Sequence, residues 1–224
     1  YDNCLLLIRT NPQAALSAAS DWESKDGGGA AIHCEALSLV ALHRYAEAAG
    51  RLNTLARTTN NATDRAVLYD QAGNAWLLAR RPDNAQNSFT VALTFKPRDA
   101  DLYADRARAF ALKPDWVSAD NDLTAALAAA PNRGDLLVLR ASARHAMGKK
   151  AEARADIDQA LALNSGNVDA LELRGEMKAE AGDQIGAQTD WKTVVAQAPR
   201  SAAAKDAQDH LSALIQPPPA APKK

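Results

Sequence analysis

A repeat of 34 residues constrains the fold of this chain more than any other feature. Two columns of small residues recur at this spacing. They consist of Ala36, Gly73, Ala107, Ala141 and Gly175, and of Ala48, Ala85, Ala119, Ala153 and Ala187. The repeat defines five units, 29–62, 66–99, 100–133, 134–167 and 168–201, with three residues inserted between the first two. A period of this length indicates an array in which each unit buries its apolar face against its neighbours.

Each unit is predicted to contain two helices. Apolar residues lie three and four positions apart, as at Tyr69, Ala72 and Trp76, which is the helical pattern. The pattern is interrupted within units near Pro82, Pro114, Gly148 and Gly182, and between units near Pro97, Pro131 and Pro199. Because the chain is rich in alanine and only 5% aromatic, closely packed helices are favoured over sheets. Small residues are expected where two helices cross closely.

These units resemble the tetratricopeptide repeat. The resemblance covers residues 29–201 and rests on the period, the two small columns, the closing prolines and the aromatic slot of the second helix, filled by Phe89 and Trp191. Unit 134–167 departs from the pattern, with Ser165 in place of the closing proline and Arg144 in an aromatic slot. The resemblance implies an all-α fold, a right-handed superhelical solenoid of helix hairpins.

Both ends of the chain are expected to differ from the regular units. Residues 1–28 are predicted to form a degenerate helical hairpin, Asp2 to Arg9 and Pro12 to Trp22, followed by a loop at Gly27 to Gly29. Residues 202–216 are predicted to form a capping helix with a polar outer face that includes His210. Residues 217–224 are predicted to be a disordered proline-rich tail.

Two cysteines leave the redox state and the compartment open. Cys4 and Cys34 could form one disulfide or remain as two buried thiols, and zinc held by both cysteines and His33 is a third, weaker alternative. The start at Tyr1, the possible disulfide and the proline-rich end favour a periplasmic or otherwise exported protein. A cytoplasmic protein is the alternative.

Charged residues also recur at the repeat spacing. Arg106, Arg140 and Arg174 form one column, and Asp122, Asp156 and Asp190 form another. We predict a structural ladder of arginine–aspartate pairs between helices, which would fix the register of the stack. A third column, Asp101, Asp135 and Asp169, starts the first helices and is interpreted as capping rather than as a metal or ligand comb.

The sequence shows no pattern that indicates catalysis. It contains no nucleophile set, phosphate-binding glycine loop or paired-carboxylate motif, and the four histidines lie in different units. We therefore predict no catalytic residues, no metal and no cofactor. The four tryptophans, Trp22, Trp76, Trp116 and Trp191, are expected to lie in the core.

Charge narrows the classes of partner. A net charge of -1 argues against nucleic acid and anionic membranes, and no apolar run reaches the roughly 18 residues of a spanning helix. The resemblance implies a concave face, built by the first helices, that binds a peptide or protein segment. In this register the face presents His33, Leu37, Asp70, Asn74, Asp105, Arg108, Leu139, Ser142, His145, Glu172 and Glu176.

The leading interpretation is a non-enzymatic scaffold for protein–protein interaction. Asp70 and Asp105 stand where carboxylate-binding relatives carry basic residues, so a chaperone C-terminus is not expected and a polar or basic segment is. The alternatives are a self-assembling structural protein and, less favoured, a small-ligand carrier.

Overall fold

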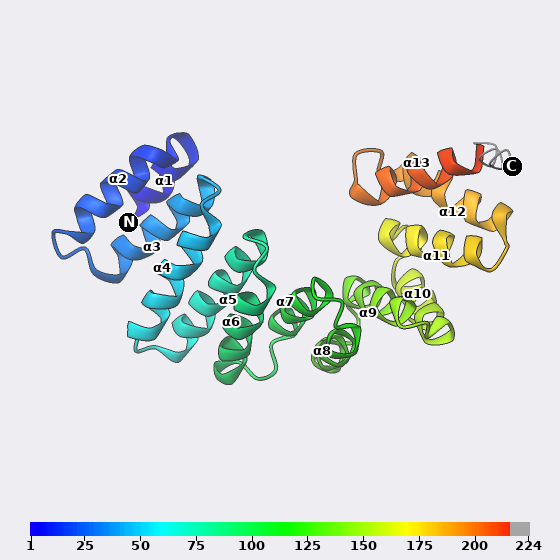
Figure 1. Ribbon diagram of the computed structural model, residues 1–224, viewed down its shortest axis with the longest axis horizontal. Helices are drawn as coiled ribbons and strands as arrows, with labels where there is room; N and C mark the ends of the chain where they lie inside the picture. Colours follow the sequence, from blue (N-terminus) through cyan, green and yellow to red (C-terminus); the bar gives the residue numbers. More distant parts are fainter. Residues whose placement is uncertain (216–224) are drawn as a thin grey trace, which may run out of the picture. The chain divides into compact units, whose positions relative to one another are not determined.

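The computed structural model describes residues 1–215, which form helices and no strand (Figure 1). The helices are α1 (Asp2–Thr10), α2 (Pro12–Glu23), α3 (Gly28–Ala41), α4 (Tyr45–Thr58), α5 (Ala62–Leu78), α6 (Pro82–Phe95), α7 (Ala100–Ala111), α8 (Trp116–Ala129), α9 (Gly134–Ala146), α10 (Lys150–Leu163), α11 (Val168–Glu180), α12 (Gln184–Gln197) and α13 (Ala202–Ile215). The tail expected at 217–224, and residue 216, lie outside the described residues. Among the described helices, none is both long and apolar enough to cross a bilayer.

The chain divides into two compact units, residues 1–129 and 130–224. The first contains the hairpins α1–α2, α3–α4, α5–α6 and α7–α8, and the second contains α9–α10, α11–α12 and the helix α13. In each unit a first helix packs against its own second helix and against the second helix of the preceding hairpin. Helix α13 packs against α12 and α11, where a further first helix would lie.

The helix starts correct three sequence expectations. Side chains that cap α7 and α11 belong to Asp99 and Asn167, which accept bonds from backbone amides, whereas Asp101 and Asp169 lie inside the first turns. Asp135 also lies inside a first turn, where Arg133 binds it at 2.7 Å. Gly28 and Gly29, expected in a loop, begin α3 instead.

The three inserted residues lengthen a helix instead of a loop. Helix α5 has 17 residues, whereas α7, the next first helix, has 12. The Asn61 side chain caps α5 by accepting bonds from Thr63 and Asp64 amides. Since the helix starts at Ala62, position 66, expected to open a repeat unit, lies inside its second turn.

The core of each hairpin matches a small residue to a large one. Both columns of small residues are buried, and every alanine of the second-helix column is at most 1% exposed. A Cβ atom added to Gly73 would lie 2.5 Å from the Phe89 ring, and one added to Gly175 would lie 2.5 Å from the Trp191 ring. Ala107 and Ala141 occupy the same column, and their counterparts in the second helix are the smaller Leu123 and Ile157.

Three of the four tryptophans are less buried than the sequence suggests. Trp191 is 2% exposed, but Trp22, Trp76 and Trp116 are only partly buried. His210, expected on the polar outer face of the last helix, stacks on Trp191 with ring centres 4.7 Å apart. His210 is therefore partly buried against α12.

A disulfide joins α1 to α3. Cys4 and Cys34 are bonded, with Cα atoms 6.2 Å apart, and the Cys34 side chain is buried. Helix α1 contains no buried residue of its own. The covalent link therefore supplies an attachment that the apolar packing of this short helix does not.

Candidate functional site

Three arginine–aspartate pairs span the hairpins. Arg106 donates two hydrogen bonds of 2.7 Å to Asp122. Arg140 reaches Asp156 at 3.0 and 2.7 Å, and Arg174 reaches Asp190 at 2.8 and 2.7 Å. Each pair lies within one unit of the repeat, and the carboxylates are buried. Bidentate pairing between buried groups fixes the register of the two helices of a hairpin. We therefore assign these residues to the scaffold rather than to a binding surface.

The position four residues after each arginine explains the departure at Arg144. In unit 100–133 this position holds Phe110, whose ring lies 6.0 Å from the Arg106 guanidinium. In the next unit Arg144 donates a 2.9 Å bond to Asp156, and in the last unit Lys178 donates a 2.8 Å bond to Asp190. A cation thus replaces the aromatic ring by pairing with the same carboxylate.

Polar side chains link consecutive first helices in residues 1–129. We call the side of α3, α5 and α7 that carries them the first-helix face. At one end, His33 Nδ1 lies 2.5 Å from the Tyr1 hydroxyl and His33 Nε2 lies 2.8 Å from Gln71 Oε1. In Figure 1, α1, α3, α5 and α7 are the first helices of four consecutive hairpins.

Asn74 ties two carboxylates together on this face. Its Nδ2 donates to Asp70 Oδ1 at 3.0 Å and lies 3.3 Å from Asp105 Oδ2 across to the next first helix. The exposed Arg108 donates a 2.6 Å bond to Asp105. Four of the residues predicted to face a partner, Asp70, Asn74, Asp105 and Arg108, are therefore in one bonded group.

The Asp70 carboxyl retains its proton unusually well. Burial raises its pKa from 3.8 to about 6, and the negative charges of Asp105, Asp99 and Asp101 add to the shift while Lys96 opposes it. Burial also raises the pKa of Asp105, although Arg108 and Asn74 act in the other direction. The negative charges near Asp70 therefore outweigh the positive charge of Lys96.

The second unit carries its own first-helix face on α9 and α11. Leu139 is partly buried, and Ser142 bonds to the carbonyl of Val138 on its own helix at 3.0 Å. Glu172 lies 3.5 Å from His210. Burial raises the pKa of Glu172 to about 7, with further contributions from Glu176, Asp206 and Asp169. Half-buried acidic groups thus occur on this face too.

Sequence reasoning missed several partners on these faces. Gln71 and Glu180 were assigned no role and His210 was placed on a polar outer face, yet these residues contact His33, His145 and Glu172 respectively. These partners lie 38, 35 and 38 positions apart, close to one period. Pairing each first-helix column with the next unit would have found them.

One of the four histidines, which lie in different repeats, is close to two carboxylates of a neighbouring helix. Within the described residues, His145 on α9 lies with Glu176 and Glu180 on α11, and one ligand atom from each falls within 4.8 Å of the others. The three come from adjoining repeats, so spacing within one unit does not reveal the group.

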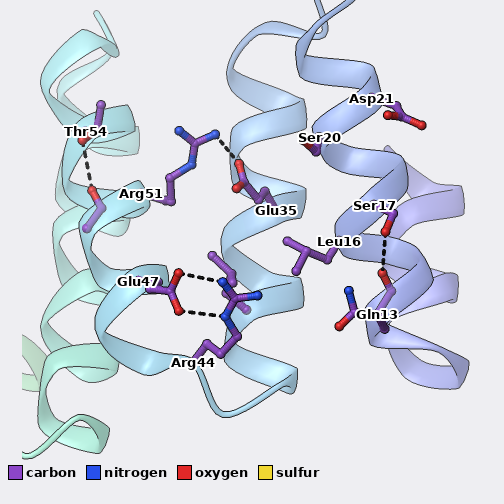
Figure 2. Close-up of a pocket in the computed structure, with 12 residues that line it drawn as sticks. Gln13, Leu16, Ser17, Ser20, Asp21, Glu35, Arg44, Glu47, Arg51 and Thr54 are labelled. Carbon is purple, nitrogen blue, oxygen red and sulfur yellow. Dashed lines mark hydrogen bonds and ion pairs between the residues drawn. The ribbon is translucent and has the colours of Figure 1, made fainter.

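A cavity of about 800 Å³ lies apart from the first-helix face, lined by α2, α3 and α4 (Figure 2). Figure 2 shows Arg44 paired with Glu47 at the start of α4, and Arg51 of α4 paired with Glu35 of α3. Arg51 also pairs with Glu23. Both arginines that line the cavity are thus already matched by carboxylates of the protein.

Comparisons with known proteins give relatives by structure only. No protein-family model matches the chain, and no curated protein matches it. A thermophilic tetratricopeptide-repeat protein of Thermus thermophilus superposes with a TM-score of 0.64 at 18% identity, covering 84% of this chain and 100% of that one. YrrB, described as a tetratricopeptide-repeat protein with an unusual peptide-binding site, gives a TM-score of 0.61 at 16% identity, covering 85% and 96%.

A shorter match has a peptide bound. The second tetratricopeptide-repeat domain of human RPAP3, solved with the HSP70 peptide SGPTIEEVD, gives a TM-score of 0.51 at 24% identity. This match covers 53% of the present chain and 98% of the domain. At these identities the likeness concerns the fold.

Proposed function

The chain has the tetratricopeptide-repeat fold, and from this premise we propose that it is a non-enzymatic protein-interaction module that binds a basic segment of another protein. The proposed contact surface is the first-helix face of residues 1–129, around Asp70, Asn74 and Asp105. The first-helix face of α9 and α11, with Leu139, Ser142, His145, Glu172 and Glu176, would extend the same preference for a polar or basic partner.

One observation carries this proposal. Two half-buried carboxylates, Asp70 and Asp105, are held together by a single amide, and burial raises the pKa of both. A lysine or arginine side chain placed between them would supply the positive charge that Asp70 lacks. The bonds to Asn74 hold the carboxylates in position before the partner arrives, so little ordering is lost on binding.

The structural relatives support peptide binding as the class of function. Peptide binding appears in the descriptions of YrrB and of the human RPAP3 domain. The peptide bound by RPAP3 ends in acidic residues, Glu-Glu-Val-Asp. Carboxylates of that kind would be repelled by Asp70 and Asp105, so the partner proposed for this chain has the opposite charge.

Peptide titration tests the proposal. A fluorescent peptide of alternating lysine and alanine is titrated against the protein at pH 7.5 and low salt, with SGPTIEEVD as the acidic comparison. We expect the basic peptide to bind and the acidic one not to. Asp70→Asn with Asp105→Asn should weaken binding by about tenfold, the loss of about 1.4 kcal/mol.

Asp83→Asn is the matched control, because Asp83 is an exposed aspartate on the second helix α6, paired with Lys113. Its affinity for the basic peptide should stay within about twofold of the parent, since exposed pairs contribute little. Equal binding by the Asp70/Asp105 double variant, or tighter binding of the acidic peptide, would refute the proposed surface.

The expected compartment and the possible self-association of the chain remain predictions. The bonded Cys4–Cys34 pair supports an exported protein, since disulfides persist in oxidising compartments. Self-association is supported by α1, where Leu6 is 64% exposed and Leu5 is 37% exposed. Light scattering at several concentrations would show whether Leu6→Gln lowers the average mass.

A further inference from the structure

Two adjoining first helices of the second unit bring together three side chains that bind metals. His145 is near the end of α9, and Glu176 and Glu180 are four residues apart near the end of α11. Residues four apart share one side of a helix, so both carboxylates point toward the same neighbour. His145 Nε2 lies 3.1 Å from Glu180 Oε2, and the three ligand atoms lie within 4.8 Å of one another.

The spacing of these atoms suits a small ion. Zinc holds nitrogen and oxygen ligands at about 2.0–2.2 Å, which separates neighbouring tetrahedral ligands by roughly 3.4 Å. One ligand pair is already at 3.1 Å, and a change of carboxylate rotamer would close the remaining gap. The exposed Glu180 has the freedom to make that change, whereas the His145 side chain, 13% exposed, is held in place.

The ligand types select the class of ion. Imidazole nitrogen binds zinc, copper, iron and nickel well, while calcium and magnesium prefer sites made wholly of oxygen. The two carboxylates carry two negative charges, and the imidazole offers a nitrogen ligand. A divalent cation would neutralise this excess.

Lys150 is the competing cation. Its ammonium lies 2.7 Å from the same Glu180 oxygen that faces His145. Because the Lys150 side chain is 63% exposed, it can move into solvent at little cost. A metal ion would replace one charge with two while adding bonds to His145 and Glu176.

We propose that His145, Glu176 and Glu180 form a site for one divalent transition-metal ion, with zinc as the best match and at least one coordination position open. His145 and Glu176 also lie on the proposed first-helix face of α9 and α11, but the site shares no residue with the group of Asp70, Asn74 and Asp105, which belongs to residues 1–129. It also goes beyond a scaffold role, because an open position lets the ion accept a donor atom from another molecule.

Calorimetric titration of ZnCl₂ into the full chain tests the site. The protein is freed of purification tags, treated with chelator and kept at pH 7.5. We expect one zinc ion per chain. Because outer-shell changes alone weaken metal sites by about 10–100-fold, loss of a ligand in His145→Ala or Glu180→Gln should weaken zinc by at least about tenfold.

Two further variants sharpen the result. Lys150→Met removes the competing ammonium and should bind zinc at least as tightly as the parent. His43→Ala removes a histidine that belongs to no group of three metal-binding side chains in the described residues, and the zinc affinity of this variant should match that of the parent. Cobalt(II), used as a spectroscopic substitute, should give visible absorption bands in the parent that His145→Ala lacks.

Three results would overturn the site. They are no zinc binding by the parent, unchanged affinity in both His145→Ala and Glu180→Gln, and weaker binding in Lys150→Met. Circular dichroism shows whether each variant is folded, and the exposed Glu180→Gln change keeps the test valid if His145→Ala unfolds. Failure here leaves the basic-peptide titration unaffected, since that assay reads Asp70 and Asp105.

Discussion

At the scale of single residues, ionisation of Asp70 is expected to destabilise the fold while it strengthens binding of a basic peptide. Its pKa is about 6 in the folded chain against 3.8 for an ordinary aspartate, so the folded state holds the proton more tightly. The contribution of Asp70 to stability is therefore largest below about pH 4 and is lost as pH rises through about 6. Asp70→Asn should raise the melting temperature at pH 7.5 by about 2–4 °C, the change for about 1 kcal/mol in a chain of this size.

Thermal unfolding followed by circular dichroism checks this prediction. At pH 4 the native carboxyl is largely protonated and resembles the amide, so the parent and Asp70→Asn should melt together. An equal gain at both pH values would show that ionisation of Asp70 is not the cause.

The ladder pairs make a second residue-scale prediction. Asp122→Ala leaves the Arg106 guanidinium, 19% exposed, without its carboxylate, and should cost about 3–5 kcal/mol in the free energy of unfolding. Glu47→Ala breaks an equally short pair with Arg44, but both side chains are about half exposed, so its effect on the free energy of unfolding should be much smaller. Urea unfolding of both variants decides, and similar losses would contradict the structural role of the ladder.

Residue patterns predicted contacts only where they repeat. The Arg106–Asp122 pair follows from two columns that recur together, because both partners obey one period. The Asp99 cap did not follow, since the corresponding position in the next unit is Arg133, which breaks the column. The His145–Glu180 contact joins two different columns across a repeat boundary, so neither column reveals it alone.

At the scale of helices, the fit of Gly73 to Phe89 should be directly measurable. Gly73→Ala would improve helix propensity, but its Cβ would meet the ring of a fully buried Phe89 at 2.5 Å. Overpacking of this kind costs about 1–3 kcal/mol, so we expect a net loss of stability. Adding Phe89→Leu to Gly73→Ala recreates the pair found at Ala107 and Leu123. In the Phe89→Leu background, Gly73→Ala should therefore cost less stability than it does in the parent.

Gly50 provides the control for this prediction. It lies in the middle of α4, and a Cβ there would meet nothing within 4 Å. Gly50→Ala should therefore stabilise the chain by about 1 kcal/mol through helix propensity alone. Denaturant unfolding measures both variants, and a stabilising Gly73→Ala would disprove the close crossing.

Helix boundaries show what local signals omit. Proline and glycine correctly marked the turns before α6 and after α9. They failed at Gly28 and Gly29, because a helix can begin at glycine when its remaining residues pack well, and Cys34 and Ala31 of α3 are buried. The extra turn of α5 was missed because an insertion in sequence does not say whether it lengthens a helix or a loop.

At the scale of the whole chain, the repeat predicted the fold but not its division. Five similar units imply one continuous array, whereas the structure separates residues 1–129 from residues 130–224. A period reports what the units share, and it contains no information about where a chain divides. Charge has a similar limit, because a net charge of -1 conceals the acidic groups on the first-helix faces.

These acidic groups predict that binding of the basic peptide depends on pH. With a pKa of about 6, Asp70 is about one-tenth ionised at pH 5 and almost fully ionised at pH 7.5, so affinity should rise several-fold between them. The other charged groups near Asp70 are Asp105 on α7, Asp99 and Asp101, which raise its pKa, and Lys96, which lowers it, while Arg108 binds Asp105. Fluorescence anisotropy at fixed ionic strength measures the change in affinity.

Asp70→Asn should remove the pH dependence of binding, and a pH profile that survives this substitution would assign the effect to another group. Because the same ionisation that strengthens binding weakens the fold, a bound cation should restore the stability lost above pH 6.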